Sequence, residues 1–433
     1  MAKIRDAERM SANELLAMAA AKMAAEQQSG VFYDFELSVE ERLRKVMGDI
    51  GQHNLSIREQ AQTRDAQPCP KCGRLCRVRR NLVRRKIVTM GGELTVRRHY
   101  HYCSSCKDGW YPLDAELGLP QEGELSARME QVVLDLGLHD TFESSAERFA
   151  LHHGFPISEN LVRRVVDRVG RSAEAREDFA ERVRPVTSTV PDTLIVQVDG
   201  SMVPTRGPQA WHEVKVGLVV RSEKVLSNKG RGFIEDARFV ARLGDYEGFK
   251  KELTAALNAE RASEANRIVV VGDGAPWVWS MADELCFCPV QVLDYPHAAE
   301  HASTAARLVF GEGDGLGAVF VEAIKRMLWE RQIEDEIQQL AECALADRGQ
   351  SREALQDLHR YYTTNASRMR YDQYRAQGLP CGSGSIESAH RHVLQKRMKL
   401  AGQHWDTARA DRLARLRAGL STCGPGQIYQ AAA

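Results

Sequence analysis

The sequence predicts a chain of several domains that combines α+β and α/β parts. Its 433 residues suffice for two to four domains. Two Cys-x-x-Cys pairs with strand-like stretches between them predict a small zinc ribbon. Farther along, apolar runs that end near an Asp are separated by helical patterns, which is typical of an α/β sheet. These observations divide the chain into the segments that follow.

Composition excludes several classes of protein. The 59 Lys and Arg residues balance 59 Asp and Glu residues, so the chain is not a uniformly basic, histone-like protein. No apolar run approaches the roughly 18 residues of a membrane span. Residues 1–10 are too charged for a secretory signal. We therefore expect a cytoplasmic protein with no membrane partner.

Residues 1–62 read as two helices separated by a break. Ser11 and Ser38 each begin a capping box, and Gly30 lies between the two patterns. The segment is interpreted as a helical hairpin that packs on another part of the protein, with a dimerisation arm as the alternative.

Residues 63–120 are predicted to form the zinc ribbon. Each Cys-x-x-Cys turn offers two thiolates, and a hairpin through Gly91 and Gly92 would bring the two turns together. Four thiolates complete a tetrahedral shell that leaves no position for substrate, so the single Zn²⁺ would be structural. The predicted ligands are Cys69, Cys72, Cys103 and Cys106, and Cys76 is not expected to be one.

The ribbon carries a strong excess of positive charge. Ten basic residues lie between its first and last ligands, and Glu93 is the one acid there. A cluster of one sign is typical of a surface that contacts a phosphate backbone, although an ordinary solvated surface is the alternative. The predicted DNA-binding residues are Arg74, Arg77, Arg79, Arg80, Arg84, Arg85, Lys86, Arg97 and Arg98.

Residues 121–188 are predicted to be a helix-turn-helix-like domain. A helix over 142–152 is followed by a break at 154–156 and by a second helix with an N-cap at Ser158. Three arginines of the second helix lie away from its apolar face and are predicted to contact DNA: Arg163, Arg164 and Arg168. Simple packing between two helices is the alternative.

From residue 189 the pattern predicts a sheet with acids at its edge. Buried strands are expected at 194–196, 214–218, 268–271 and 290–293, with a helix over 246–262. Asp199 and Asp273 follow two of these strands, and Glu387 stands at the start of a later helix. Ligands bind at the carboxyl ends of strands in open sheets. Three converging carboxylates require a cation, which predicts two Mg²⁺ or Mn²⁺ ions.

Several short motifs occur together in a fixed order. They are Tyr102–Cys106, Tyr111–Asp114, Leu117–Pro120, Val198–Gly200, Gly272–Trp277, Asp294–His297 and Gly384–Glu387. In this order they resemble the DDE transposases of bacterial insertion sequences, in particular the ISKra-type group, which are relatives of Mutator-like transposases. The resemblance covers roughly residues 65 to 415.

The resemblance implies an RNase H-like catalytic domain over 189–297 and 378–420, with an all-helical insertion over 298–377 and a flexible tail over 421–433. Asp199, Asp273 and Glu387 would then be the catalytic triad and the ligands of the two metal ions. Asp294 and His297 resemble the Asp-x-x-His signature of the Mutator-like relatives and would be auxiliary residues, although a helix cap explains them equally well.

The implied activity is cleavage of element ends and strand transfer into target DNA. The partners would be double-stranded DNA, as terminal inverted repeats and as target, and a second copy of the chain, at the bacterial nucleoid. Basic residues after Glu387 would follow the DNA backbone: Arg391, Lys396, Arg397 and Lys399. The alternatives are a non-enzymatic DNA-binding regulator and a structure-selective nuclease on the same fold.

Overall fold

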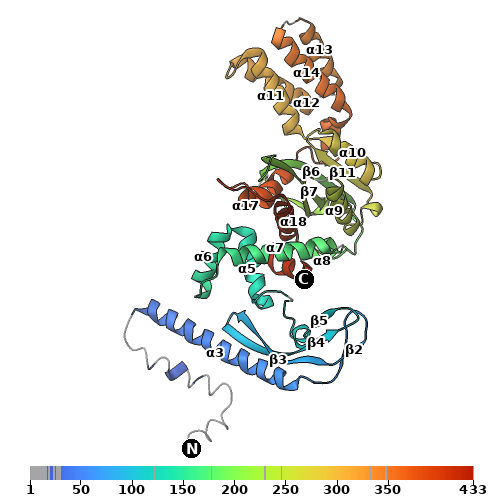
Figure 1. Cartoon of the computed structure of the whole chain (residues 1–433). Coiled ribbons are helices and arrows are strands. Elements are labelled where there is room, and N and C mark those ends of the chain that lie inside the picture. Colours follow the sequence, from blue (N-terminus) through green and yellow to red (C-terminus); the bar gives the residue numbers. More distant parts are fainter. Residues whose placement is uncertain are drawn as a thin grey trace, which may run out of the picture. The chain divides into compact units, whose positions relative to one another are not determined.

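The computed structural model describes residues 17, 20–22, 25, 31–120, 122–176, 178–228, 231–244, 246–330, 333–346 and 349–432. It divides into two compact units, which we call unit 1 and unit 2 (Figure 1). Unit 1 comprises Met1–Leu136 and Glu143–Glu159, and unit 2 comprises Gly137–Phe142 and Asn160–Ala433. Both units contain helices and strands, so the predicted mixture of α and β structure is confirmed.

The centre of unit 1 is the predicted hairpin between the two cysteine pairs. Strand β3 (Val78–Thr89) pairs antiparallel with β4 (Gly92–Cys103), and β5 (Asp108–Trp110) pairs with the end of β4. Gly92 adopts a φ of +102°, which favours glycine in so tight a turn. The short strands β1 (Gln67–Pro68) and β2 (Leu75–Cys76) pair with each other around the first cysteine pair.

Helix α3 (Phe32–Ala61) lies along the edge of β4. The Gln52 side chain donates to the carbonyl of Thr95 and accepts from its N–H, both at 2.9 Å, and Glu59 accepts from the N–H of Arg97. These side chains take the place of a neighbouring strand and satisfy an edge that would otherwise be open. The predicted cap at Ser38 is wrong, because Ser38 lies inside α3 and donates to the carbonyl of Phe35. The predicted box at Ser11 lies outside the described residues.

Helices also form where the helix-turn-helix was predicted. They are α6 (Phe142–His153) and α7 (Glu159–Ala175), with α4 (Pro112–Glu116) and α5 (Ala127–His139) before them and α8 (Phe179–Val183) after. Because α6 belongs mainly to unit 1 and α7 to unit 2, the helix-turn-helix arrangement stays a prediction.

Unit 2 is built on a five-stranded sheet with the order β10-β7-β6-β11-β12. The strands are β6 (Thr193–Pro204), β7 (Trp211–Arg221), β10 (Arg238–Leu243), β11 (Arg267–Gly272) and β12 (Val290–Leu293). β7 is antiparallel to both β6 and β10, whereas β11 and β12 run parallel to β6. The two parallel strands need crossovers, which α9 (Tyr246–Ala259) and α10 (Pro276–Leu285) provide.

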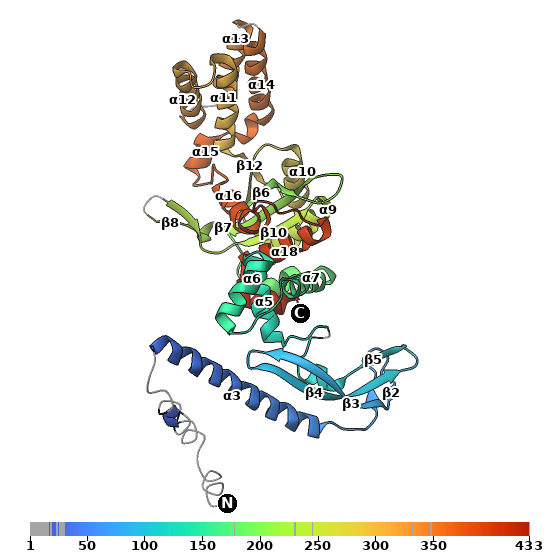
Figure 2. The ribbon, with the colours of Figure 1, turned by 60° about the vertical axis from the view of Figure 1, so that its left-hand side comes forward.

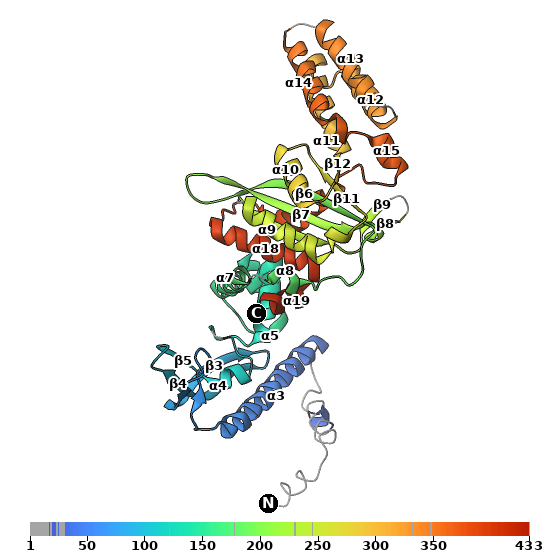
Figure 3. The same cartoon turned by 90° about the vertical axis from the view of Figure 1, so that its right-hand side faces the viewer.

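The middle of the sheet is buried between helices. Val196 and Val198 belong to the main core together with Phe249 and Leu253 of α9. Figure 3 shows α9 lying over the sheet. The other face, which carries Gln197, contacts the start of α16 (Gly384–Ala389). After it come a π-helical turn (His390–Gln395), α17 (Lys396–Met398), α18 (Thr407–Cys423) and α19 (Pro425–Ala432). The prediction of a flexible tail over 421–433 is wrong for the described residues, because α19 is helical and its Ile428 is fully buried.

Strand β6 differs from the prediction at its end. Asp199 was expected to terminate the strand, but β6 continues to Pro204 and stays paired with β7, first beside β10 and beyond Ser201 as a two-stranded ribbon (Figure 3). Burial is interrupted at Asp199: the residues from Thr193 to Val198 are buried, Asp199 is half-buried, and the strand is buried again at Val203 and Pro204. The sequence also gave no sign of the β8–β9 hairpin (Val225–Asn228 and Arg231–Ile234).

The segment between β12 and α16 is helical, as expected. Its main elements are α11 (Tyr295–Phe310), α12 (Gly315–Glu330), α13 (Ile333–Ala346), α14 (Gly349–Asn365) and α15 (Tyr371–Ala376). Helices α11 to α14 lie side by side as a bundle (Figure 2). In the part of the chain that the structure describes, no helix is both long and apolar enough to cross a membrane.

The bundle contains a buried acid that makes its stability depend on pH. Glu336 in α13 is 4% exposed and its Oε2 has no hydrogen-bond partner, and burial raises the pKa of its carboxyl from 4.5 to about 7. A raised folded-state pKa means that stability is fully present below about pH 4.5 and is lost as the pH rises through 7.

We expect Glu336→Gln to stabilise the bundle at pH 8 by up to about 3 kcal/mol, because each unit of pKa shift is worth about 1.4 kcal/mol, and to give little gain at pH 4.5. Thermal unfolding at the two pH values measures this. Asp335→Asn, on the same helix but exposed, is the matched control. An equal gain at both pH values would contradict the assignment.

Candidate functional site

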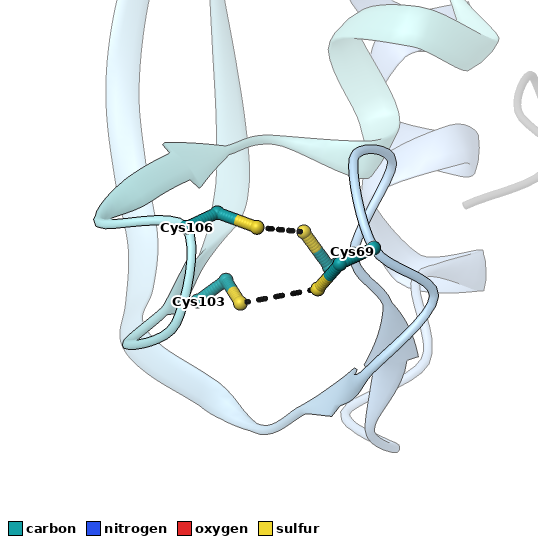
Figure 4. A group of neighbouring side chains, drawn as sticks. Cys69, Cys103 and Cys106 are labelled. Atoms are coloured by element: carbon teal, nitrogen blue, oxygen red, sulfur yellow. Dashed lines mark hydrogen bonds between the residues drawn. The ribbon is translucent and has the colours of Figure 1, made fainter.

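The four predicted zinc ligands lie together in unit 1. The sulfur atoms of Cys69, Cys72, Cys103 and Cys106 all lie within 4.8 Å of one another. Figure 4 shows the cluster with Cys69, Cys103 and Cys106 labelled. The Sγ atoms are 3.9 Å apart for Cys69 and Cys106, and 3.7 Å apart for Cys72 and Cys103. A tetrahedral zinc with bonds of about 2.3 Å requires sulfurs about 3.8 Å apart, so the geometry fits a structural metal such as zinc.

The electrostatics of the cluster also favour a cation. Contacts with the Cys72 sulfur and then burial raise the pKa of Cys106 to about 12, whereas the backbone N–H of Cys106 helps to lower the pKa of Cys103 to about 6. One thiolate therefore forms readily and opposes the ionisation of the next. A divalent metal removes this opposition by neutralising the thiolates.

The predicted DNA-binding residues of the ribbon fall into two groups. Arg85 and Arg98 both contact the carboxylate of Asp114, and their side chains are at most 10% exposed. Lys86 is exposed but is paired with Glu93 at 2.8 Å. The remaining members are exposed, and no carboxylate in the described part of the chain forms an ion pair with them: Arg74, Arg77, Arg79, Arg80, Arg84 and Arg97.

Two of the exposed arginines lie over tyrosine rings. The guanidinium carbon of Arg79 is 4.6 Å from the ring centre of Tyr102, and that of Arg80 is 5.9 Å from the ring of Tyr100. Both arginines lie in β3 where register shifts occur between Val78 and Val83. Bulges of this kind re-aim side chains, so positive groups gather near the cysteine end of the hairpin.

In unit 2, two of the predicted acids lie just beyond the last register pair of two neighbouring strands. Val271 of β11 is the partner of Gln197 of β6, and the two strands are parallel. Asp273 and Asp199 each lie two residues beyond this last pair, Asp273 after the end of β11 and Asp199 within β6. Neighbouring strands lie about 4.8 Å apart, so the two carboxylates start from adjacent points at the edge of the parallel pairing.

The turn after β11 holds Asp273 in a defined place. The Asp273 carboxylate accepts from the N–H of Ala275 at 2.9 Å, and the hydroxyl of Tyr361 donates to its backbone carbonyl at 3.0 Å. Gly274 has a φ of +99°, and a Cβ there would come within 2.9 Å of the Tyr361 hydroxyl. Glycine is therefore required where α14 approaches this turn.

The third acid, Glu387, lies on α16, which is fastened to the same strand. The side chain of Gln197 donates to the carbonyl of Gly382 at 3.3 Å and accepts from the N–H of Ile386 at 3.0 Å. Glu387 is the next residue and is exposed. Gln197 thus holds the start of the helix that carries Glu387 against β6. Gln197 precedes Asp199 by two residues in the same strand.

Asp294 fastens the same segment from the other side. One of its carboxylate oxygens accepts from the N–H of His297, which caps α11, and the other accepts from the N–H of Ser383 at 2.7 Å. Asp294 is buried, and this burial raises the pKa of its carboxyl although both N–H groups oppose the shift. Asp294 therefore caps α11, as the helix-cap alternative proposed. Its bond to Ser383 also joins the two ends of the helical segment between β12 and α16.

His297 does not share this burial. Its Nδ1 atom lies 3.7 Å from a carboxylate oxygen of Glu300, and its ring centre lies 5.6 Å from that of His301. His301 in turn stacks on Tyr361 with ring centres 3.7 Å apart. Burial, and then the charges of Asp273 and Asp294, raise the pKa of Tyr361, so both acids act on the same ring.

The sequence analysis missed His390, which contacts Asp199 directly. Its Nε2 atom lies 3.1 Å from Oδ2 of Asp199, and its side chain is 5% exposed. Neither ring nitrogen meets the geometry of a hydrogen bond. His390 follows Glu387 by one helical turn, so the two side chains start from the same side of the helix. The Glu-x-x-His spacing was the available signal.

The basic residues after Glu387 are also divided. Lys399 donates to the hydroxyl of Ser201, and the Asp199 charge opposes the lowering of its pKa by burial. Arg397 is buried between the rings of Phe142 and Trp405, where burial lowers its pKa to about 10, so it is not a surface residue. The other predicted DNA contacts of unit 2 are placed as follows: Arg163, Arg164, Arg391 and Lys396 are exposed, and Arg168 is half-buried.

The three acids do not form a closed metal cluster. In the described ranges of the chain, the four cysteines are the one set with three or more possible ligand atoms within 4.8 Å of one another. A cleft of about 1040 Å³ lies beside α16 and is lined by Ser385, Ser388 and Lys396, and none of the three acids lines it. The carboxylate oxygens of Asp199, within β6, and of Asp273, just after β11, nevertheless have the donor chemistry that Mg²⁺ and Mn²⁺ prefer.

For the cysteine cluster we expect one zinc per purified chain and its loss in Cys103→Ser, because a buried ligand is removed. Metal content by mass spectrometry measures this, with thermal unfolding in chelator as the second readout. Cys76→Ser is the matched control, since Cys76 is buried beside the cluster but is not one of the four ligands. Full zinc content in Cys103→Ser would refute the assignment.

Comparison with known proteins gives three findings. No curated protein matches the chain. Among solved structures, the Drosophila P element transposase strand transfer complex matches with a TM-score of 0.24 and 10% identity over 69% of this chain and 65% of that chain, less than two thirds of its length. Residues 76–410 match the uncharacterised protein family UPF0236, and because this match spans most of the chain, the protein belongs to that family.

Proposed function

We propose that this protein is a DNA transposase that cleaves and joins DNA strands through Asp199, Asp273 and Glu387 on an RNase H-like sheet. The observation that supports the proposal is the docking of the segment that bears Glu387 against β6, the strand that carries Asp199. Gln197 and His390 hold this segment against β6, and Asp273 follows β11, the parallel neighbour of β6.

The sheet itself supports this proposal. In chain order, β6, β7 and β10 are successively antiparallel, and β11 and β12 run parallel to β6. β6 is therefore the central strand and has β11 as a parallel neighbour. In open sheets, ligands bind at the carboxyl ends of such parallel strands. The helical bundle, which the resemblance implies as an insertion, separates β12 from α16 in the chain.

The chain's own residues would position and orient the reacting groups. Asp199, Asp273 and Glu387 would hold two divalent cations, which when bound supply an activated water and neutralise charge on the phosphodiester. The buried Asp294 would fix the loop before Glu387. His390 would be a positioning residue that limits how far the Asp199 side chain can turn.

The exposed arginines of the ribbon support DNA as the substrate. Arg77, Arg79, Arg80 and Arg84 all lie on β3 and its approach, and no carboxylate in the described chain pairs with them. Unpaired guanidinium groups on a strand suit phosphate contact. Arg98 and Arg397, which the sequence analysis included, are buried and are left out of the proposal.

The same arginines and the zinc-type cluster would also serve a regulator that binds DNA without cutting it. The two functions differ in one measurement. A regulator binds DNA but leaves a supercoiled plasmid intact in Mg²⁺ or Mn²⁺, whereas a transposase cuts it and joins the new end to a second DNA. Cleavage without joining would favour the nuclease alternative.

We expect Asp273→Asn to lose metal-dependent cleavage by at least roughly a hundredfold, because one of the groups that hold charge at the reaction centre is removed. The assay uses plasmid DNA that carries the coding segment with its flanks, in Mg²⁺ and in Mn²⁺. Asp283→Asn is the matched control, since Asp283 is exposed on α10 and accepts from Gln291. Equal cutting by wild type and Asp273→Asn would exclude the proposed chemistry.

The same assay examines His390. We expect His390→Phe to raise the metal concentration for half-maximal cleavage by roughly tenfold, as removal of a group behind a metal ligand does. A residue that served folding alone would change thermal stability and leave the metal titration unmoved.

For DNA binding we expect Arg80→Ala with Arg84→Ala to weaken affinity for duplex DNA. The slope of log affinity against log salt should fall by about 2, since each lost phosphate contact removes about 0.9 from it. Fluorescence anisotropy at several salt concentrations measures this. Arg58→Ala is the control, because Arg58 is exposed in the same unit but is paired with Glu116. An unchanged salt slope in the double variant would remove β3 from the DNA interface.

A further inference from the structure

Helix α3 uses one of its faces within its own chain. Residues spaced by three or four along the helix contact the hairpin: Gly48 approaches Gly91, Gln52 bonds to Thr95, and Leu55 packs on the core of the ribbon. A Cβ on Gly48 would come within 2.5 Å of the Gly91 carbonyl oxygen, so the contact is close. This face of α3 is therefore occupied.

The opposite face of α3 is apolar and exposed. At 100° per residue, a stripe of five large apolar side chains falls about half a turn from Gly48 and Leu55. Their exposed fractions lie between 46 and 69%. The members are Phe32, Leu43, Val46, Ile50 and Ile57. A solvent-exposed stripe of this length on a 30-residue helix indicates a surface that a partner covers.

The spacing of the stripe is that of a coiled coil. Leu43, Ile50 and Ile57 recur every seven residues, and a second set with the same period contains Phe32, Val39, Val46 and His53. The first set occupies the a positions and the second the d positions of a heptad repeat, with Glu36 as the first a residue. A period of 3.5 residues keeps such a seam against a partner helix.

We propose that this seam pairs with α3 of a second copy of the chain, as an antiparallel two-stranded coiled coil. In one antiparallel register every a residue faces a d residue of the other copy. Leu43 then meets Val46, Ile50 meets Val39, and Ile57 meets Phe32. The pairing is self-complementary, as a two-fold symmetric interface requires.

The polar layer fixes both the partner and the direction. In the antiparallel register Glu36 of each copy faces His53 of the other, which pairs a carboxylate with an imidazole twice in each dimer. A parallel pair would set Glu36 against Glu36 and His53 against His53, with like groups in contact. A second copy of the chain supplies a complementary residue in every layer of this register, including the Glu36–His53 layers. An unrelated helix would not be expected to do so.

The inference does not depend on the proposed catalysis, because it rests on unit 1 alone. We expect light scattering after gel filtration to give about twice the 48.5 kDa of one chain for the wild type. Ile50→Asp should weaken the dimer by roughly a hundredfold or more, since it buries two unpaired carboxylates in the seam. A monomeric wild type, or an Ile50→Asp variant that remains as dimeric as wild type, would overturn the proposal.

The matched control is Leu151→Asp, which changes a more exposed leucine on α6 and should leave the dimer intact. Because Ile50 is 65% exposed within the chain, its replacement should not affect folding, and circular dichroism and zinc content check this. Loss of the dimer in Leu151→Asp as well would show that the effect is not specific to the seam and would refute it.

A charge exchange tests the direction. His53→Glu should weaken the dimer roughly tenfold by placing two carboxylates in each polar layer, and the double variant Glu36→Lys with His53→Glu should restore it. In a parallel coiled coil the double variant creates Lys–Lys and Glu–Glu layers and cannot recover. Failure of the double variant to recover would exclude the antiparallel register.

Discussion

The candidate active site depends on the docking of one loop against one strand. Gln197 lies in the buried part of β6, where its amide reaches both the carbonyl of Gly382 and the N–H of Ile386. Asp294, itself buried, accepts from Ser383 between these two points. Buried polar groups are costly unless they are paired, so each of these residues is held in place by the bonds that it makes. Glu387 owes its position to this docking, because the residue before it, Ile386, donates its N–H to Gln197 of the sheet.

Much of the sheet was predictable because its strands are apolar runs. The strands β6, β7, β11 and β12 all lie where the sequence predicted them. Strand β10 was missed because Arg238 and Arg242 interrupt its apolar pattern. In the structure Glu260 pairs with Arg238 and Asp411 with Arg242, and these acids come from distant segments. Similarly, the sequence around Ser38 resembles a helix cap because capping signals are local. The helix nevertheless continues through Ser38, and farther along it Gln52 and Glu59 bond to β4.

The acids of the candidate site were predictable from the sequence, whereas the residues that hold them in place were not. Acids that follow buried strands are visible in a sequence, whereas the amide of Gln197 and the imidazole of His390 stand in ordinary strand and helix patterns. Counting charges also overestimated the basic surface. Arg98 was counted as a surface residue, but Asp114 and the ring of Tyr111, 3.6 Å from its guanidinium carbon, enclose it. A sequence shows how many charged residues a segment has and of which sign. Which of these side chains are exposed to solvent depends on the tertiary structure.

Tyr361 joins the helical bundle to the backbone of Asp273, and its ring stacks on His301 of the first helix in the same bundle. A domain inserted in a loop can often be exchanged for another one, since its two ends lie close together in the surrounding fold. Here a half-buried tyrosine near the end of α14 donates a hydrogen bond to the turn that follows β11. A chimera that exchanged the bundle for another one would have to preserve this phenol and the glycine beside it, which ties the evolution of the insertion to that of the sheet.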